Sequence, residues 1–174
     1  MLDTYKISFI NLEEGNHIFK FKVEKEFFEQ FDFHNIKGGN LNILVNLEKQ
    51  EKLLILDFSI KGFVNSVCDI CLDSFDLQVE ISDRLYVKFN EIALEQIDEN
   101  IIIGLDEKEI NIAHNIFEII ELNLPHKRIH PINEQDENQC NVTMLNKINE
   151  HIMKKETEQK TDPRWEKLKK INLQ

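Results

Sequence analysis

The sequence predicts an α+β fold: an N-terminal antiparallel β-sheet, or a partly open barrel with a long hairpin, followed by C-terminal helices. Segments with apolar side chains at every second residue fill the first half of the chain. Segments with apolar residues at spacings of three and four lie in the second half. Strands that do not alternate with helices cannot build parallel βαβ units, so this order favours an antiparallel sheet. We expect a β-rich domain at residues 1–125, which carries the cysteine pair described below and one packed helix. A loop and helices at residues 126–174 then dock on that domain or trail from it.

The expected strands are recognised by their period of two, which places one side of a strand on a core. A short segment of sequence KEFFEQF at residues 25–31 interrupts them and favours one or two helical turns, with its three Phe on one side. A further short strand is expected at residues 101–103, inside a stretch rich in acidic residues. The five principal strands are expected at residues 5–10, 17–23, 41–47, 52–67 and 75–89.

The clearest expected helix covers residues 111–122, where isoleucines and one Phe recur at spacings of three and four. Asn111 can cap its start, and Pro125 ends it because proline lacks a backbone donor. A second helical pattern covers residues 141–153. A last helix is expected after Asp162-Pro163, because proline is favoured at the first position of a helix.

Composition and charge limit the classes of function. The 174 residues are 41% hydrophobic, enough for a core, and the net charge is −11. A chain this acidic is a poor candidate for nucleic-acid binding over its whole surface, since phosphate backbones reward clustered Lys and Arg. No apolar run is long enough for a membrane helix, and no secretory leader is recognisable. We therefore expect a cytoplasmic protein.

Two of the three cysteines form a C-x-x-C pair, Cys68 and Cys71, between the two longest expected strands. The pair is expected at a hairpin tip, where two thiolates can point at one tetrahedral ion. Cys140, with His130 or His126, could complete a site for a structural zinc ion. Two alternatives remain open, namely thiols that bind no metal and thiols used in redox chemistry. Asp69 beside Cys68 argues against redox use, because a neighbouring carboxylate raises a thiol pKa.

No pattern in the chain indicates an enzyme. The histidines form no H-E-x-x-H motif, no nucleophile-base-acid constellation is recognisable, and the glycine-rich motifs that cradle nucleotides are absent. We therefore predict a non-catalytic protein without a bound nucleotide.

Two basic segments stand out against the acidic background. One lies in the loop that follows the clearest helix, and the other surrounds the single Trp near the C-terminus. Cations beside an aromatic ring can hold RNA by phosphate contact and stacking, although a docking helix with solvated lysines would show the same pattern. The candidate residues for binding RNA or a protein partner are Lys127, Arg128, Arg164, Trp165, Lys167, Lys169 and Lys170.

Several of these features occur in an order that resembles the YceD family, the large ribosomal RNA subunit accumulation proteins. The resemblance covers about residues 60–173. Its parts are Val67-Cys68-Asp69-Ile70-Cys71-Leu72-Asp73-Ser74-Phe75, Glu109-Ile110-Asn111-Ile112-Ala113, Leu124-Pro125, Arg128-Ile129-His130-Pro131, Cys140, and Asp162-Pro163-Arg164-Trp165-Glu166-Lys167-Leu168-Lys169-Lys170.

The resemblance implies a cytoplasmic bacterial protein that supports accumulation of the large-subunit (23S) ribosomal RNA and acts in ribosome assembly. Its expected partner is precursor ribosomal RNA or a ribosomal protein. The C-x-x-C with a later His and Cys is frequent in the family, which strengthens the set Cys68, Cys71, His130 and Cys140 as candidate zinc ligands. One alternative is an acidic binding module or chaperone for basic ribosomal proteins, and a weaker one is a zinc- or thiol-dependent redox protein.

Overall fold

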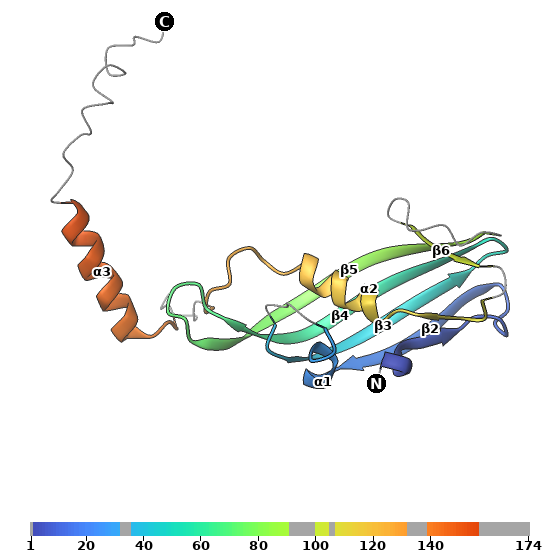
Figure 1. Ribbon diagram of the computed structural model, residues 1–174, viewed down its shortest axis with the longest axis horizontal. Helices are drawn as coiled ribbons and strands as arrows, with labels where there is room; N and C mark the ends of the chain where they lie inside the picture. Colours follow the sequence, from blue (N-terminus) through green and yellow to red (C-terminus); the bar gives the residue numbers. More distant parts are fainter. Residues whose placement is uncertain (1, 32–35, 91–99, 105–106, 132–138, 157–174) are drawn as a thin grey trace, which may run out of the picture. The chain divides into compact units, whose positions relative to one another are not determined.

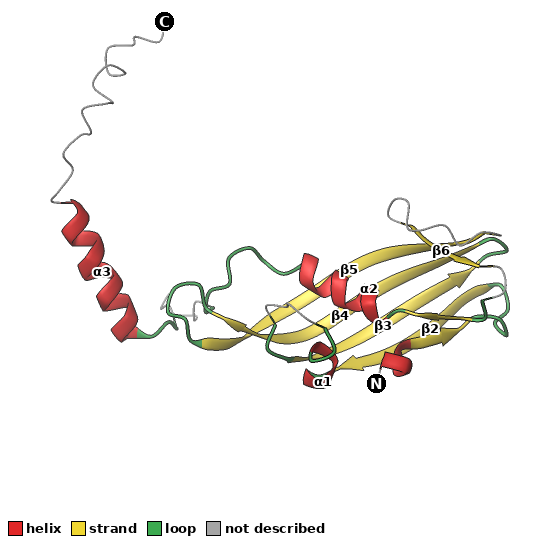
Figure 2. Ribbon diagram, in the orientation of Figure 1, coloured by secondary structure: helices red, strands yellow, loops and turns green. Residues whose placement is uncertain are grey.

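The computed structural model describes residues 2–31, 36–90, 100–104, 107–131 and 139–156. The chain divides into two compact units, one made of Met1–Val67 with Ser74–Arg128 and the other of Cys68–Asp73 with Ile129–Gln174. The expected division into a β-rich domain at residues 1–125 and a loop with helices at 126–174 that dock on it or trail from it stays a prediction. In chain order (Figures 1 and 2), the elements of the first unit are η1 (Leu2–Tyr5), β1 (Lys6–Ser8), β2 (Gly15–Val23), α1 (Lys25–Phe28), β3 (Gly39–Lys49), β4 (Leu53–Val67), β5 (Ser74–Asn90), β6 (Asn100–Gly104), β7 (Glu109–Asn111) and α2 (Ala113–Leu122).

The first unit is built on a five-stranded sheet of order β2-β3-β4-β5-β6. Its first four strands pair antiparallel as successive hairpins, and β6 adds parallel to β5. The sheet is open, with β2 and β6 at its edges, and a second sheet pairs β1 with β7. The α+β expectation is therefore confirmed in its antiparallel-sheet form, and the described strands do not close into a barrel.

One face of the five-stranded sheet carries the core. In β3, Leu41, Ile43, Val45 and Leu47 are buried at every second position, whereas the residues between them are exposed or half-buried. The same alternation runs along β4, as the period of two predicts. Helix α2 lies along this sheet in Figure 1 and contributes three fully buried residues to the same core, Ile112 just before the helix and Ile116 and Ile120 within it.

Aromatic rings fill the end of the core near α1. Phe27 and Phe28 are buried, as expected from the KEFFEQF pattern, although the α-helix itself is only one turn long. The ring of Phe31 stacks on that of Phe117 with centroids 4.2 Å apart. The side-chain oxygen of Asn111 accepts a hydrogen bond from the Ala113 N–H at 3.0 Å. The N-cap position is Ile112, however, so α2 begins later than expected and the prediction of Asn111 as its cap residue is wrong.

Close backbone approach between β3 and β4 requires glycine at Gly62. Its φ is +148°, and a Cβ built there would lie 2.2 Å from the backbone oxygen of Asn40. Only a residue without Cβ can combine this conformation with this contact. The glycine therefore allows β4 to stay in register with β3 over its whole length.

The second unit is small. It contains the hairpin tip at Cys68–Asp73, the described parts of the loop that begins at Ile129 after α2, and helix α3 (Val142–Glu156). The helix confirms the pattern expected at residues 141–153. None of the helices described here is long and apolar enough to cross a lipid bilayer. The helix expected after residue 162 lies outside the described residues.

Candidate metal centre

The tip of the β4–β5 hairpin is a tight turn closed by its own backbone. The N–H of Cys68 donates to the oxygen of Asp73 at 2.9 Å, and the N–H of Leu72 donates to the oxygen of Cys68 at 3.0 Å. Leu72 has a φ of +64°, a left-handed conformation that costs a non-glycine residue about 1–2 kcal/mol. Such conformations persist where the surroundings impose them, and they are frequent at functional sites. The turn brings Cys68 and Cys71 to the same side of the tip.

Backbone donors converge on the Cys68 sulfur. The N–H of Ile70 lies 3.5 Å from Cys68 Sγ. Burial by itself would raise the pKa of this thiol, but hydrogen bonds from the backbone of Cys71, Ile70 and His130 outweigh burial and lower the pKa to about 6. The expected rise in pKa caused by Asp69 is therefore wrong. The tip therefore favours a thiolate at Cys68 at neutral pH, and thiolate is the form that binds metals.

Two residues from the loop beyond α2 complete the cluster. His130 Nδ1 lies 3.5 Å from Cys71 Sγ and 3.7 Å from Cys140 Sγ. Cys140 Sγ lies 3.6 Å from Cys68 Sγ. The four ligand atoms all lie within 4.8 Å of one another. The structure thus brings together all four residues of the predicted set, across as many as 72 positions of sequence.

These separations fit a tetrahedral zinc ion. With Zn–S bonds of about 2.3 Å and a Zn–N bond of about 2.0–2.1 Å, tetrahedral angles put two sulfurs about 3.8 Å apart and a sulfur and a nitrogen about 3.5–3.6 Å apart. The contacts of 3.5, 3.6 and 3.7 Å match three of the six edges, and the other three ligand pairs lie within 4.8 Å. A disulfide would need about 2.05 Å, and all three cysteines are free. The donor set of three thiols and one imidazole is also one that zinc prefers.

The electrostatics of the three thiols also favour a bound cation. The Cys140 thiol has its pKa raised to about 11, first by burial and then by hydrogen bonds to Cys68 and Cys71 and by their negative charge. Three sulfurs this close cannot all be anionic without a compensating cation, because like charges repel strongly when buried. A divalent ion would remove that repulsion and displace the remaining protons.

Hydrogen bonds of one side chain hold the start of α3 next to the cysteine-histidine cluster. Asn141 follows Cys140 directly, and its side-chain oxygen accepts hydrogen bonds from the N–H groups of Thr143 at 3.0 Å and Met144 at 3.4 Å. The nitrogen of the same amide donates to the Asp73 carboxylate at 3.2 Å. One side chain therefore caps the helix and links it to the hairpin tip. Sequence reasoning missed this role of Asn141 and Asp73, although an Asn before a helical pattern is a capping signal.

The other candidate residues are not part of this cluster. Lys127 and His126 are exposed and Arg128 is half-buried, all in the first unit. Most of the acidic stretch expected to connect the strands lies outside the described residues. So do the remaining basic candidates, Arg164, Trp165, Lys167, Lys169 and Lys170.

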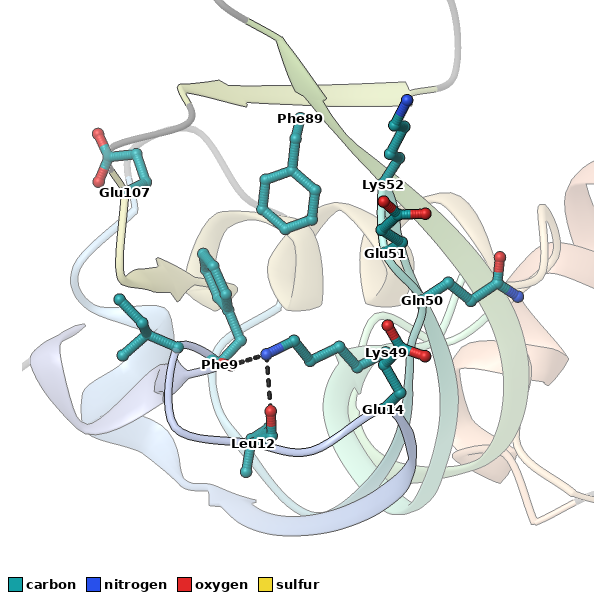
Figure 3. Close-up of a pocket in the computed structure, with 10 residues that line it drawn as sticks. Phe9, Leu12, Glu14, Lys49, Gln50, Glu51, Lys52, Phe89 and Glu107 are labelled. Atoms are coloured by element: carbon teal, nitrogen blue, oxygen red, sulfur yellow. Dashed lines mark hydrogen bonds between the residues drawn. The ribbon is translucent and has the colours of Figure 1, made fainter.

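A cavity of about 720 Å³ in the first unit was not foreseen from the sequence (Figure 3). Phe9 and Phe89 lie on its wall with ring centroids 5.5 Å apart. The ammonium group of Lys49 donates to the backbone oxygens of Phe9 at 2.9 Å and Leu12 at 2.7 Å. The described lining includes no cysteine, histidine or serine. It therefore offers no nucleophile paired with an imidazole base.

Comparison with known protein families gives a match. The model of the family described as "Large ribosomal RNA subunit accumulation protein YceD" matches residues 56–172, about two thirds of the chain. No curated protein and no solved structure matches the chain. The matched region starts in β4 and includes the hairpin tip, α2, the loop with His130 and Cys140, and α3. The chain belongs to the YceD family, whose name connects it with accumulation of the large-subunit ribosomal RNA.

Proposed function

We propose that the protein is a non-enzymatic cytoplasmic factor that supports accumulation of large-subunit ribosomal RNA during ribosome assembly, by binding precursor RNA or a ribosomal protein. Family membership carries this proposal. The burial of the three thiols bears on the redox alternative. Reactive cysteines need solvent access, and Cys68, Cys71 and Cys140 expose 0%, 2% and 4% of their surface. Burial therefore disfavours the redox alternative.

The metal in this proposal is zinc with a structural role. Bound by Cys68, Cys71, His130 and Cys140, it would supply a crosslink with four protein ligands and no open coordination position, which is the mark of a structural site. The hairpin tip positions two of the ligands, and Asn141 joins the first turn of α3 to Asp73 by a hydrogen bond. Zinc thereby fixes where α3 begins.

Helix α3 is the element that this crosslink would present to a partner. Its exposed surface includes Lys147 and His151, beside the apolar side chains of Met144, Ile148 and Ile152. Mixed basic and apolar surfaces suit RNA contacts as well as contacts with a ribosomal protein. The exposed ammonium of Lys127 in the first unit is a second candidate contact. The acidic-module alternative gains no support from the described residues.

Deletion of the gene tests the proposal. We expect a lower ratio of large- to small-subunit ribosomal RNA in the deletion strain, restored by the wild-type gene. A Cys68→Ser/Cys71→Ser variant should restore it poorly. A matched Ser59→Ala/Ser82→Ala variant, which changes two residues away from the hairpin tip, should restore it fully. An unchanged RNA ratio in the deletion strain would refute the proposal.

Crosslinking in cells then separates the two kinds of partner. Ultraviolet light joins proteins to RNA in direct contact, whereas a lysine-reactive reagent captures protein neighbours. Enrichment of precursor large-subunit RNA supports the RNA partner, and enrichment of ribosomal proteins alone supports the protein partner. Lys127→Glu should reduce the recovered partner, because it reverses an exposed charge. Recovery of neither class would contradict direct binding.

A further inference from the structure

Strand β2 forms an edge of the five-stranded sheet, and it is nine residues long. Its one strand neighbour among the described residues is β3. An edge of this length presents backbone N–H and C=O groups in the arrangement that another strand would use. Natural edge strands are usually short, bulged or covered, so a long edge is informative about binding.

The hydrogen-bond pattern identifies which backbone groups face outward. Gln50 and Leu53 close the β3–β4 hairpin with a bond of 2.9 Å, so alternate residues counted back from Gln50 along β3 face β4 and the residues between them face β2. The register with β2 then leaves its even-numbered residues facing away from β3. Lys22 agrees with this, because its oxygen accepts a bond from the Tyr5 hydroxyl at 2.9 Å. The backbone groups of Asn16, Ile18 and Lys20 thus face the edge and have no hydrogen-bond partner in the described part of the chain.

An apolar side chain stands at the centre of this edge. Ile18 lies on the side of the sheet opposite the core and is 65% exposed. On β3, Leu44 lies diagonally next to it on the same side and is 38% exposed. Exposed apolar residues on an unpaired edge favour strand addition, because pairing would cover side chains and backbone groups together.

We propose that a second copy of this chain pairs with this edge, β2 to β2 in antiparallel orientation, centred on Ile18. In this register Ile18 stands opposite the Ile18 of the second copy, and Lys20 stands opposite Asn16. Lys22 stands opposite Glu14 of the second copy, which lies with Glu13 just before the other strand. The arrangement is self-complementary, as a twofold interface must be. It joins the two five-stranded sheets into one.

Lysines often protect edge strands from such pairing, and here they select the register instead. Centring the pair on Lys20 would place two lysines directly opposite each other, which is destabilising. It would also set Ile18 against Lys22. Centring on Ile18 avoids both contacts and uses the backbone groups of Asn16, Ile18 and Lys20 on both copies. Of these two registers, charge therefore favours the one centred on Ile18.

Sedimentation of the full chain tests whether the dimer exists. We expect a reversible dimer, and Ile18→Lys should raise its dissociation constant at least about tenfold, because it puts two cations face to face and removes an apolar contact. Leu122→Lys is the matched control, since Leu122 is 84% exposed at the end of α2 and should leave the dimer unchanged. A monomer at every concentration overturns the proposal, as does a dimer that Ile18→Lys leaves intact.

Disulfide trapping tests the register even if Ile18→Lys folds poorly. In the proposed pair the two Ile18 Cα atoms lie about 5.5 Å apart, within the range that a disulfide spans. Ile18→Cys should therefore form a crosslinked dimer under mild oxidation. Lys20→Cys should not, because its two copies are separated by four residues of strand, about 13 Å. The unsubstituted chain measures any background from its native thiols. Equal crosslinking of both variants, or none at Ile18→Cys, overturns the register. Failure here leaves the ribosomal RNA proposal untouched, because the dimer does not depend on it.

Discussion

Replacing Cys140 by Ser should weaken zinc binding without destabilising the sheet of the first unit. Cys140 Sγ contacts both Cys68 Sγ, at 3.6 Å, and His130 Nδ1, at 3.7 Å, so it would occupy one corner of the proposed zinc tetrahedron. Serine has nearly the same shape, but its hydroxyl is a poor zinc ligand. The substitution therefore removes one ligand of four with little change in packing. Cys140 lies in the second unit, so the sheet of the first unit should keep its stability.

The size of the effect follows from the energy of a complete site. Structural zinc sites in small domains bind with about 10–16 kcal/mol, which divides among four ligands into about 2.5–4 kcal/mol each. Loss of one ligand should therefore weaken zinc binding by about 60-fold to about 700-fold, at 1.4 kcal/mol for each factor of ten. A site that used only Cys68 and Cys71, with water completing the coordination, would show no change on loss of Cys140.

Competition with a chromogenic chelator measures this affinity in the wild type and in Cys140→Ser. Hydrogen exchange, measured in parallel, should show faster exchange of the first amides of α3 in the variant. The matched control is Asn141→Ala, which keeps all four ligands but loses the helix cap and the bond to Asp73. It should speed exchange at the helix start and change zinc affinity far less. Equal zinc affinity in Cys140→Ser and the wild type would refute the assignment of Cys140.

Three further predictions concern the loop, the backbone and a tyrosine. His130→Ala should lose zinc affinity to a similar degree as Cys140→Ser, whereas His126→Ala, at an exposed position of the same loop, should bind zinc normally in the chelator assay. Gly62→Ala should lower the free energy of unfolding in urea by more than about 3 kcal/mol, because strain and a backbone clash add. Gly15→Ala, also at positive φ but with nothing within 4 Å of the added Cβ, should lose about 1 kcal/mol, and equal losses would contradict the clash. Burial, and then the charge of Glu24, raises the pKa of Tyr5 above its ordinary value. The folded chain therefore keeps this proton to higher pH than the unfolded chain does. The free energy of unfolding should fall as pH rises through about 10, and this fall should be smaller in Tyr5→Phe; identical curves for the two chains would contradict it.

Most of the sheet could be predicted because long strands carry a strong alternating pattern. The two longest ones flank the C-x-x-C, so its place at a hairpin tip followed from their boundaries and is confirmed by the pairing of Val67 with Ser74. Short elements were harder. Strand β7 has three residues beside an acidic stretch, too few to show a period, and it exists because it pairs with β1. Tyr5 was expected in a strand but lies in the short helix η1. Tertiary contacts rather than local pattern determine such elements.

Part of the candidate site could likewise be predicted from the sequence, and part of it could not. Residue chemistry identified the three thiols, because a C-x-x-C is a common zinc-ligand pair and Cys140 is the one further cysteine of the sequence. The choice between His130 and His126 could not be made from spacing, since a loop without periodic structure does not fix the direction of its side chains. The structure brings His130 to the sulfurs and leaves His126 exposed. Likewise, the left-handed conformation of Leu72 has no signal in its residue type.

The role proposed for the second unit depends on zinc being bound by Cys68, Cys71, His130 and Cys140. X-ray absorption at the zinc edge, on full-length protein purified without added metal, measures it directly. We predict three sulfur neighbours at about 2.3 Å and one nitrogen at about 2.0–2.1 Å. A shell of two sulfurs completed by oxygen, or a purified chain that binds no zinc when the metal is supplied, would contradict it.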